Sequence, residues 1–63
     1  MTIEDAITTL GEWPKNRNVP RLLSEGIQAA KGQHKAQLQQ MAEILFAESL
    51  TQADIDLVDQ YFG

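Results

Sequence analysis

The chain has no cysteine and a single histidine among its 63 residues. A domain of about 60 residues buries only ~60% of the surface that its unfolded chain exposes, so its core is small and its stability is marginal. Domains of this size usually gain stability from disulfides, a structural metal or self-association, and this composition does not support the first two. We therefore expect one domain, residues 1–63, that holds no metal or other cofactor and for which a homodimer is a candidate source of added stability.

The first helix is predicted by its cap. The Thr2 side chain can accept a hydrogen bond from the backbone of Asp5, and the Asp5 carboxylate can return the contact, as in a capping box. Apolar residues then recur at helical spacing as a single stripe, and Gly11 ends the pattern. This segment predicts a surface helix that begins after Thr2 and stops near Gly11.

Residues 20–49 predict two further helices around one glycine. Pro20 suits the first turn of a helix, where a backbone N–H would have no partner. Gly26 lies inside the second helix and predicts the close approach of a neighbouring helix. Gly32 predicts a boundary, and the segment from about 34 to 49 is rich in strong helix formers. One continuous helix over 20–49 is the alternative, because no good N-cap residue follows the boundary glycine.

The last helix is predicted by Thr51 as its cap and Asp54 at its third position, and it runs to Phe62. Leu50 and Ile55 are expected to pack together across its start as a hydrophobic staple. Short connections between helices imply antiparallel neighbours. The expected fold is therefore all-α, a small compact bundle of about four short helices, mostly antiparallel, or of three helices if the two middle ones are continuous.

Charge is unevenly distributed along a chain whose net charge is −4. All five cations lie in residues 15–35 with a single acid, so this segment carries +4, whereas residues 1–14 carry −3 and residues 36–63 carry −5. The overall acidity argues against non-specific nucleic-acid binding, which needs many cations on one face. The acidic N-terminal segment does not resemble a secretory signal, and no run approaches the roughly 20 apolar residues of a membrane span. Together with the absence of cysteine, these features predict a cytoplasmic protein with no membrane partner.

The two C-terminal helices have wide apolar arcs. Apolar residues sweep roughly 160° of the last helix and, with Ile44, about 200° of the helix before it, which is more than one buried stripe needs. Either each helix contacts two neighbours in the bundle, or Ile44, Leu57 and Tyr61 form an exposed patch of the kind that binds proteins. The acidic rim of such a patch would consist of Glu43, Glu48, Asp54, Asp56 and Asp59.

The segment 12–21 holds the only tryptophan, both prolines and three of the five cations. The residue before each proline favours extended backbone and two asparagines favour turns, so the segment is a good connector. Trp13 is expected to fold onto the core, because so short a chain can hardly leave its only tryptophan unburied. The alternative is a nucleic-acid patch in which this ring stacks on a base and the cations hold phosphates. Its residues would be Trp13, Lys15, Arg17, Arg21, Lys31 and Lys35.

Residues 20–41 could also form a DNA-binding helix-turn-helix with Gly32 as the turn glycine. The following position, usually apolar and buried, would be Gln33, and the recognition helix would offer only His34 and Lys35 to phosphate. The polar residue at the turn disfavours this motif.

No group of residues predicts catalysis or a metal site. His34 has neither a cysteine nor a second histidine as a co-ligand, so a zinc site lacks ligands. Glu43 and Glu48 are five residues apart and point to different faces of their helix, and nothing pairs a nucleophile with a base. We expect the protein not to be an enzyme.

Residues 41–63 carry a methionine, then L-T-x-x-D-I, then an aromatic closing helix, at Met41, Leu50, Thr51, Asp54, Ile55, Tyr61 and Phe62. This arrangement resembles the C-terminal end of small class I c-type cytochromes. The haem attachment motif of that family, C-x-x-C-H, is absent because the chain has no cysteine. The resemblance therefore implies no haem and no ligand residue, only shared capping of a helix.

These patterns lead to one preferred function and one alternative. We expect a small non-enzymatic protein–protein interaction module, such as an adaptor, regulator or inhibitor. It would dock on another protein, or on a second copy of itself, through the apolar faces of the two C-terminal helices. The alternative is a nucleic-acid-associated regulator that uses the cations of residues 15–35.

Overall fold

The helices begin and end near the capping residues and glycines of the sequence. The computed structural model describes residues 1–62, and Gly63, the last residue of the predicted domain, lies outside the described residues. Regular structure within residues 1–62 is helical throughout. The helices are α1 (Ile3–Gly11), α2 (Val19–Ala29), α3 (Gly32–Ala47) and α4 (Gln52–Phe62).

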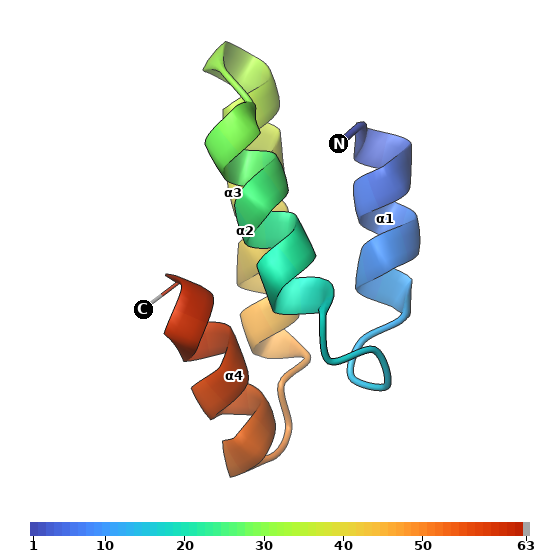
Figure 1. The fold of residues 1–63 in the computed structure, drawn as a ribbon, viewed down its shortest axis with the longest axis vertical. Helices are drawn as coiled ribbons and strands as arrows, with labels where there is room; N and C mark the ends of the chain where they lie inside the picture. The colour runs from blue at the N-terminus through green and yellow to red at the C-terminus, as the bar shows by residue number, and fades with distance from the viewer. Residues whose placement is uncertain (63) are drawn as a thin grey trace.

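Successive helices run in alternate directions along the long axis of the molecule (Figure 1). α2 and α3 form a central antiparallel pair, with α1 packed against both on one side and α4 packed against both on the other. Over the described chain, α1 and α4 do not contact each other. The predicted all-α bundle is confirmed.

Both predicted caps are present. The Thr2 Oγ1 accepts a hydrogen bond from the Asp5 backbone N–H at 3.1 Å, and the Asp5 carboxylate accepts one from the Thr2 N–H at 3.5 Å. At the start of α4, the Thr51 Oγ1 accepts a hydrogen bond from the Asp54 N–H at 3.1 Å. The predicted staple is wrong, because Leu50 lies in solvent instead of packing across the start of α4.

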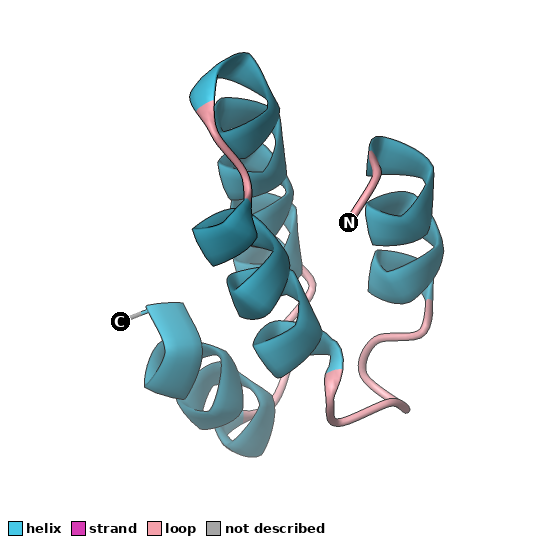
Figure 2. Cartoon of the chain, turned by 45° about the horizontal axis from the view of Figure 1, so that its top comes forward, coloured by secondary structure: helices cyan, strands magenta, loops and turns pink. Residues whose placement is uncertain are grey.

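The two middle helices are separate, as the glycine between them predicts. Ala30 and Lys31 are extended, with ψ of 159° and 156°, and Gly32 has a φ of +60°. This left-handed conformation costs a side-chain-bearing residue roughly 1–2 kcal/mol, so a glycine at this point separates α2 from α3. Figure 2 shows the loop that separates these two helices.

The core is formed by apolar side chains from all four helices and from two residues outside them, Trp13 and Ala30. Trp13, in the loop between α1 and α2, is 6% exposed, so the prediction that it joins the core is confirmed. None of the four helices combines the length and the apolar composition that a bilayer span requires. The largest side chains that are completely buried belong to Val19, Pro20, Leu23, Leu38, Leu45 and Val58.

Gly26 accommodates the first residue of the chain and not a neighbouring helix. A Cβ atom at this position would lie 3.0 Å from the Met1 Cβ and 3.1 Å from its sulfur. The Met1 carbonyl oxygen is also 2.7 Å from the His34 Nε2, at the start of α3. The close approach predicted at Gly26 is therefore present, but the approaching group is the N-terminal methionine.

Candidate protein-interaction site

Apolar side chains remain in solvent where α3 leads into α4. Phe46 near the end of α3 is 37% exposed, Leu50 in the connection is 88% exposed, and Ile55 in α4 is 40% exposed. The half-buried ring of Phe62 packs edge-on against Phe46, with ring centroids 6.3 Å apart and an interplanar angle of 67°. Ile55 and Phe62 are seven residues apart and so lie on the same side of α4. We call these four residues the α3–α4 strip.

Acidic residues lie next to this strip. Glu43 precedes Phe46 by three residues, and Asp59 follows Ile55 by four, so each carboxylate is a neighbour of the strip on its own helix. Both acids are exposed, and neither forms an ion pair within residues 1–62. Residues 36–63 contain no lysine or arginine, so the local charge of this surface is negative.

The three predicted docking residues lie on two surfaces, because Leu57 and Tyr61 share one side of α4 and Ile44 is on α3. Ile44 is 47% exposed, and it lies roughly 200° around α3 from Phe46, which contacts α4. Leu57 and Tyr61 are half-buried on α4, and Leu57 lies roughly 140° around that helix from Phe62. Ile44 thus points away from α4, and the three side chains do not form one patch.

The residues that the sequence analysis missed lie at the margins of the apolar arcs. Phe46 and Ile55 are edge positions of the arcs on their helices, where a side chain is least well covered. Leu50 belongs to no helix. Because it was assigned to a hydrophobic staple, its side chain was expected to be packed and its exposure was not predicted. The predicted residues Ile44 and Leu57 lie at the opposite edges of the same two arcs, so the sequence pattern alone does not distinguish one edge from the other.

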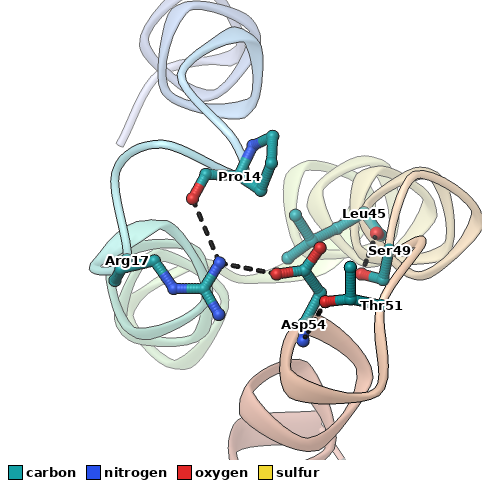
Figure 3. Close-up of polar contacts among 6 residues, drawn as sticks. All are labelled: Pro14, Arg17, Leu45, Ser49, Thr51 and Asp54. Carbon is teal, nitrogen blue, oxygen red and sulfur yellow. Dashed lines mark hydrogen bonds and ion pairs between the residues drawn. The ribbon is translucent and has the colours of Figure 1, made fainter.

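Asp54 is not part of an exposed acidic rim. Its carboxylate lies in the interior, where the Arg17 Nη1 donates a hydrogen bond to the Asp54 Oδ1 at 2.6 Å (Figure 3). The same Nη1 donates to the Pro14 carbonyl oxygen at 3.1 Å. The guanidinium holds the pKa of Asp54 below its ordinary value despite the opposing effect of burial. Asp54 therefore joins α4 to the loop between α1 and α2.

The other predicted acids of the rim are exposed. Asp56 accepts a hydrogen bond from the Gln52 Nε2 at 2.7 Å, one turn earlier on α4. Glu48 caps the C-terminal end of α3, beside the connection that carries Leu50. With Glu43 and Asp59, they make the exposed surface of α3 and α4 negatively charged.

The predicted basic patch loses its aromatic centre. Trp13 is buried, and the guanidinium carbon of Arg17 lies 4.8 Å from the centroid of its ring, which is a cation–π contact. The ring is therefore covered from within the chain and is not available to stack on a base. Arg21 is paired with Glu25, one turn later on α2, at 2.9 Å.

The remaining cations of this patch lie at two ends of the molecule. Lys15 belongs to the loop between α1 and α2, whereas Lys31 and Lys35 lie where α2 turns into α3. Figure 1 places these two connections at opposite ends of the long axis. The structure does not bring the six residues of the basic patch together.

Loop residues 11–16 line an open hollow of about 460 Å³. Its titratable lining residues are Glu12 and Lys15, and the Glu12 carboxylate accepts a hydrogen bond from the Asn16 Nδ2 at 2.8 Å. None of the lining residues is a serine, threonine, cysteine or histidine, so the hollow has no hydroxyl or thiol nucleophile. Among residues 1–62, no three metal-ligating side chains are grouped closely enough to hold an ion.

No protein-family model, curated protein or solved structure matches the chain. The resemblance of its C-terminal segment to class I c-type cytochromes is therefore not extended to a family assignment. Evidence for the function of this chain therefore comes from the geometry of the molecule.

Proposed function

We propose that this chain is a small non-enzymatic protein–protein interaction module, an adaptor, regulator or inhibitor, that binds its partner through the α3–α4 strip. The observation that carries the proposal is the strip itself: an aromatic contact between α3 and α4, with Ile55 on the same side of α4 as that contact and Leu50 88% exposed in the connection between the two helices. Patches of this kind mark protein-interaction sites, and aromatic residues are enriched among those that dominate binding energy.

The small size of the domain makes the burial of each large apolar side chain important for its stability. Complete burial of one leucine, isoleucine or phenylalanine side chain is worth about 1.5–3 kcal/mol. A chain of 63 residues has few such side chains, yet it leaves Leu50 almost entirely in solvent and Phe46 and Ile55 more than one-third exposed. A partner that covers them would recover burial that the fold alone does not use.

The alternative function, a nucleic-acid-associated regulator, has weaker support. Arg17 and Arg21 are engaged with carboxylates of the same chain, and the nearest ring is buried. Lys15 belongs to the loop between α1 and α2, and Lys31 and Lys35 belong to the connection between α2 and α3 and the start of α3, so they do not share one loop or helix. Phosphate binding needs several cations on one surface, and this arrangement provides a pair at most.

The proposal is tested by affinity capture with a variant of the strip and a matched control. The double variant Leu50→Gln/Ile55→Gln replaces two exposed apolar side chains without opening a cavity in the core. The control is Ile7→Gln on α1, because Ile7 is 59% exposed and its helix does not contact α4. Each tagged protein is incubated with extract of the source cells, and bound proteins are identified by mass spectrometry.

We expect one partner to be retained by the wild-type protein and by Ile7→Gln, and to be lost by the double variant of the strip. A partner that the double variant retains in full would contradict the proposal. Equal loss of that partner from both variants would also contradict it, because the strip would then have no special role. Circular dichroism of all three proteins establishes that each is folded before binding is compared.

A further inference from the structure

We infer that the segment bound by the α3–α4 strip is a cationic amphipathic helix of the partner protein. This inference deepens the proposed function and depends on it, since both use the same surface. It specifies two properties of the partner, the sign of its charge and its secondary structure.

The sign of the charge follows from the acids beside the strip. Glu43 flanks Phe46 and Asp59 flanks both Ile55 and Phe62, and neither acid is paired with a cation of the described chain. A partner that covers the apolar side chains must bring its own rim close to these carboxylates. Lysine or arginine at that rim would be attracted, whereas acidic residues would be repelled.

The same charges disfavour a second copy of this chain as the occupant. In a two-fold symmetric dimer the same patch meets itself, so the acids beside one strip would come close to the acids beside the other. Residues 36–63 contain no cation that could neutralise them. A different chain with a basic surface is therefore the better match.

A helix fits this surface better than an extended strand. Strand addition requires the free edge of a sheet, and residues 1–62 contain no strand. The backbone at the end of α3 is also engaged, since the N–H groups of Glu48 and Ser49 donate to the carbonyls of Ile44 and Phe46 at 3.0 and 3.1 Å. Recognition must therefore use side chains.

The spacing of the strip also suits a helical partner. Ile55 and Phe62 are seven residues apart, which is roughly 10 Å along α4. The apolar residues at positions i, i+3, i+4 and i+7 of an amphipathic helix cover about the same length. Such a helix can therefore meet both ends of the strip along α4.

The test uses two synthetic peptides that share one apolar helical face of leucines. The polar face carries lysines in one peptide and glutamates in the other, and binding of each to the full chain is followed by fluorescence anisotropy. We expect the lysine peptide to bind at least ~10-fold more tightly than the glutamate peptide at low salt. We expect this preference to shrink several-fold as the salt concentration is raised, because salt screens exposed charges.

Two charge variants separate the local rim from the net charge. Glu43→Gln/Asp59→Asn removes the acids beside the strip and should reduce the preference for the lysine peptide to less than ~3-fold. Glu4→Gln/Glu12→Gln removes the same charge from α1 and its loop and should keep the preference. Leu50→Gln/Ile55→Gln should weaken binding of the lysine peptide at least ~10-fold.

The possible failures distinguish the inference from the proposed function. If both peptides bound equally well and Leu50→Gln/Ile55→Gln abolished the binding of both, the inferred positive charge of the partner would be wrong. The strip would remain a docking site. If neither peptide bound but capture of a cellular partner still depended on the strip, the inference of a helical partner would be overturned. The proposed function would stand. If Leu50→Gln/Ile55→Gln bound the lysine peptide as tightly as the wild-type protein does, the inference would be overturned. If this variant also retained the cellular partner, the proposed function would be contradicted.

A second copy as the occupant is tested by measuring solution mass and melting temperature across a dilution series. We expect a monomer mass and a melting temperature that does not depend on concentration. A dimer mass with a melting temperature that rises with concentration, both lost in Leu50→Gln/Ile55→Gln, would overturn the inference.

Discussion

The two sides of α4 differ in a way that polarity alone does not explain. Asp54 is buried, whereas Ile55, the next residue, is 40% exposed. The aspartate lies on the side that meets the loop between α1 and α2, where Arg17 neutralises it. The isoleucine lies on the side that carries the strip, where no further helix of the bundle packs, because α1 is on the far side of α2 and α3.

This difference shows that burial in a small domain depends on what the fold places opposite each side chain. A buried carboxylate is costly without a partner, and here the partner comes from a residue 37 positions earlier. An exposed isoleucine has a smaller cost, because the folded state only lacks the free energy that burial of this side chain would have contributed. The inner side of α4 therefore serves stability, and its outer side is free to serve binding.

The largest expected loss of stability comes from substitution of Trp13, whose ring contacts Arg17 on the inner side of α4. Trp13→Ala removes the buried ring on which Arg17 rests, and we expect the free energy of unfolding to fall by about 3–5 kcal/mol. Urea denaturation followed by circular dichroism measures it, because the variant has no tryptophan fluorescence. Trp13→Phe should cost far less, since it keeps most of the ring and removes the buried Nε1–H that has no hydrogen-bond partner. Equal losses in both variants would contradict the role of the ring as an anchor.

A direct comparison of the two sides uses two truncations on α4. Val58→Ala opens a cavity at a completely buried position and should destabilise the protein by about 2 kcal/mol. Ile55→Ala removes a side chain that is already partly in solvent and introduces a better helix former, so its cost should stay below about 1 kcal/mol. Thermal melting of both variants checks the order. A larger loss from Ile55→Ala would mean that the strip belongs to the core.

The ion pair on the inner side predicts a dependence of stability on pH. Arg17 lowers the pKa of Asp54 in the folded state, so the unfolded chain takes up this proton more readily. The stabilisation is therefore complete above the ordinary carboxyl pKa of about 4 and is lost as the pH falls through the lower folded pKa. We expect the difference in melting temperature between the wild-type protein and Asp54→Asn to narrow from pH 5 toward pH 2.

A matched variant tests the cause of this pH dependence. Arg17→Met removes the largest cause of the lowered pKa of Asp54 and leaves burial, which raises that pKa, opposed only by hydrogen bonding to Thr51. The loss of stability that Asp54 causes as the pH falls from 5 toward 2 should therefore be smaller in the variant than in the wild-type protein. An unchanged pH profile would show that Arg17 does not control Asp54.

The smallest expected effect on stability is on the outer side. Leu50→Gln changes a side chain that is 88% exposed, so the free energy of unfolding should stay within about 0.5 kcal/mol of the wild-type value. Binding of the partner should nevertheless weaken, which separates function from folding at one residue. A loss of stability comparable to that of Val58→Ala would place Leu50 in the core and remove it from the strip.

The helices could be predicted because their signals are local. Thr2 and Thr51 cap helices by contacts three residues away, and Gly32 separates two helices through its own backbone conformation. The burial of Trp13 also followed from the sequence, since a short chain has few large apolar side chains with which to fill a core. Each of these features needs only the nearby residues or the overall composition.

The candidate site could be predicted only in part. The apolar surplus of the C-terminal helices was visible as wide arcs. Ile44 is exposed, as the predicted patch requires, but Leu57 and Tyr61 are half-buried. The exposed residues that were not predicted are Phe46, Leu50 and Ile55. A helical wheel gives the angle between two residues of one helix. It does not give the direction from which a second helix approaches, and that direction decides which edge of an arc is covered.

The sequence by itself determined the helical segments, their approximate ends and the acidity of the C-terminal half, and it favoured four helices over three and a buried tryptophan over an exposed one. The tertiary structure decided that Asp54 is an internal partner of Arg17, that Gly26 makes room for Met1, and that the free apolar surface lies along α3 and α4. The physical reason is one of range. Caps and glycines act within one helical turn, whereas each of these outcomes depends on groups brought together from distant parts of the chain when the helices pack.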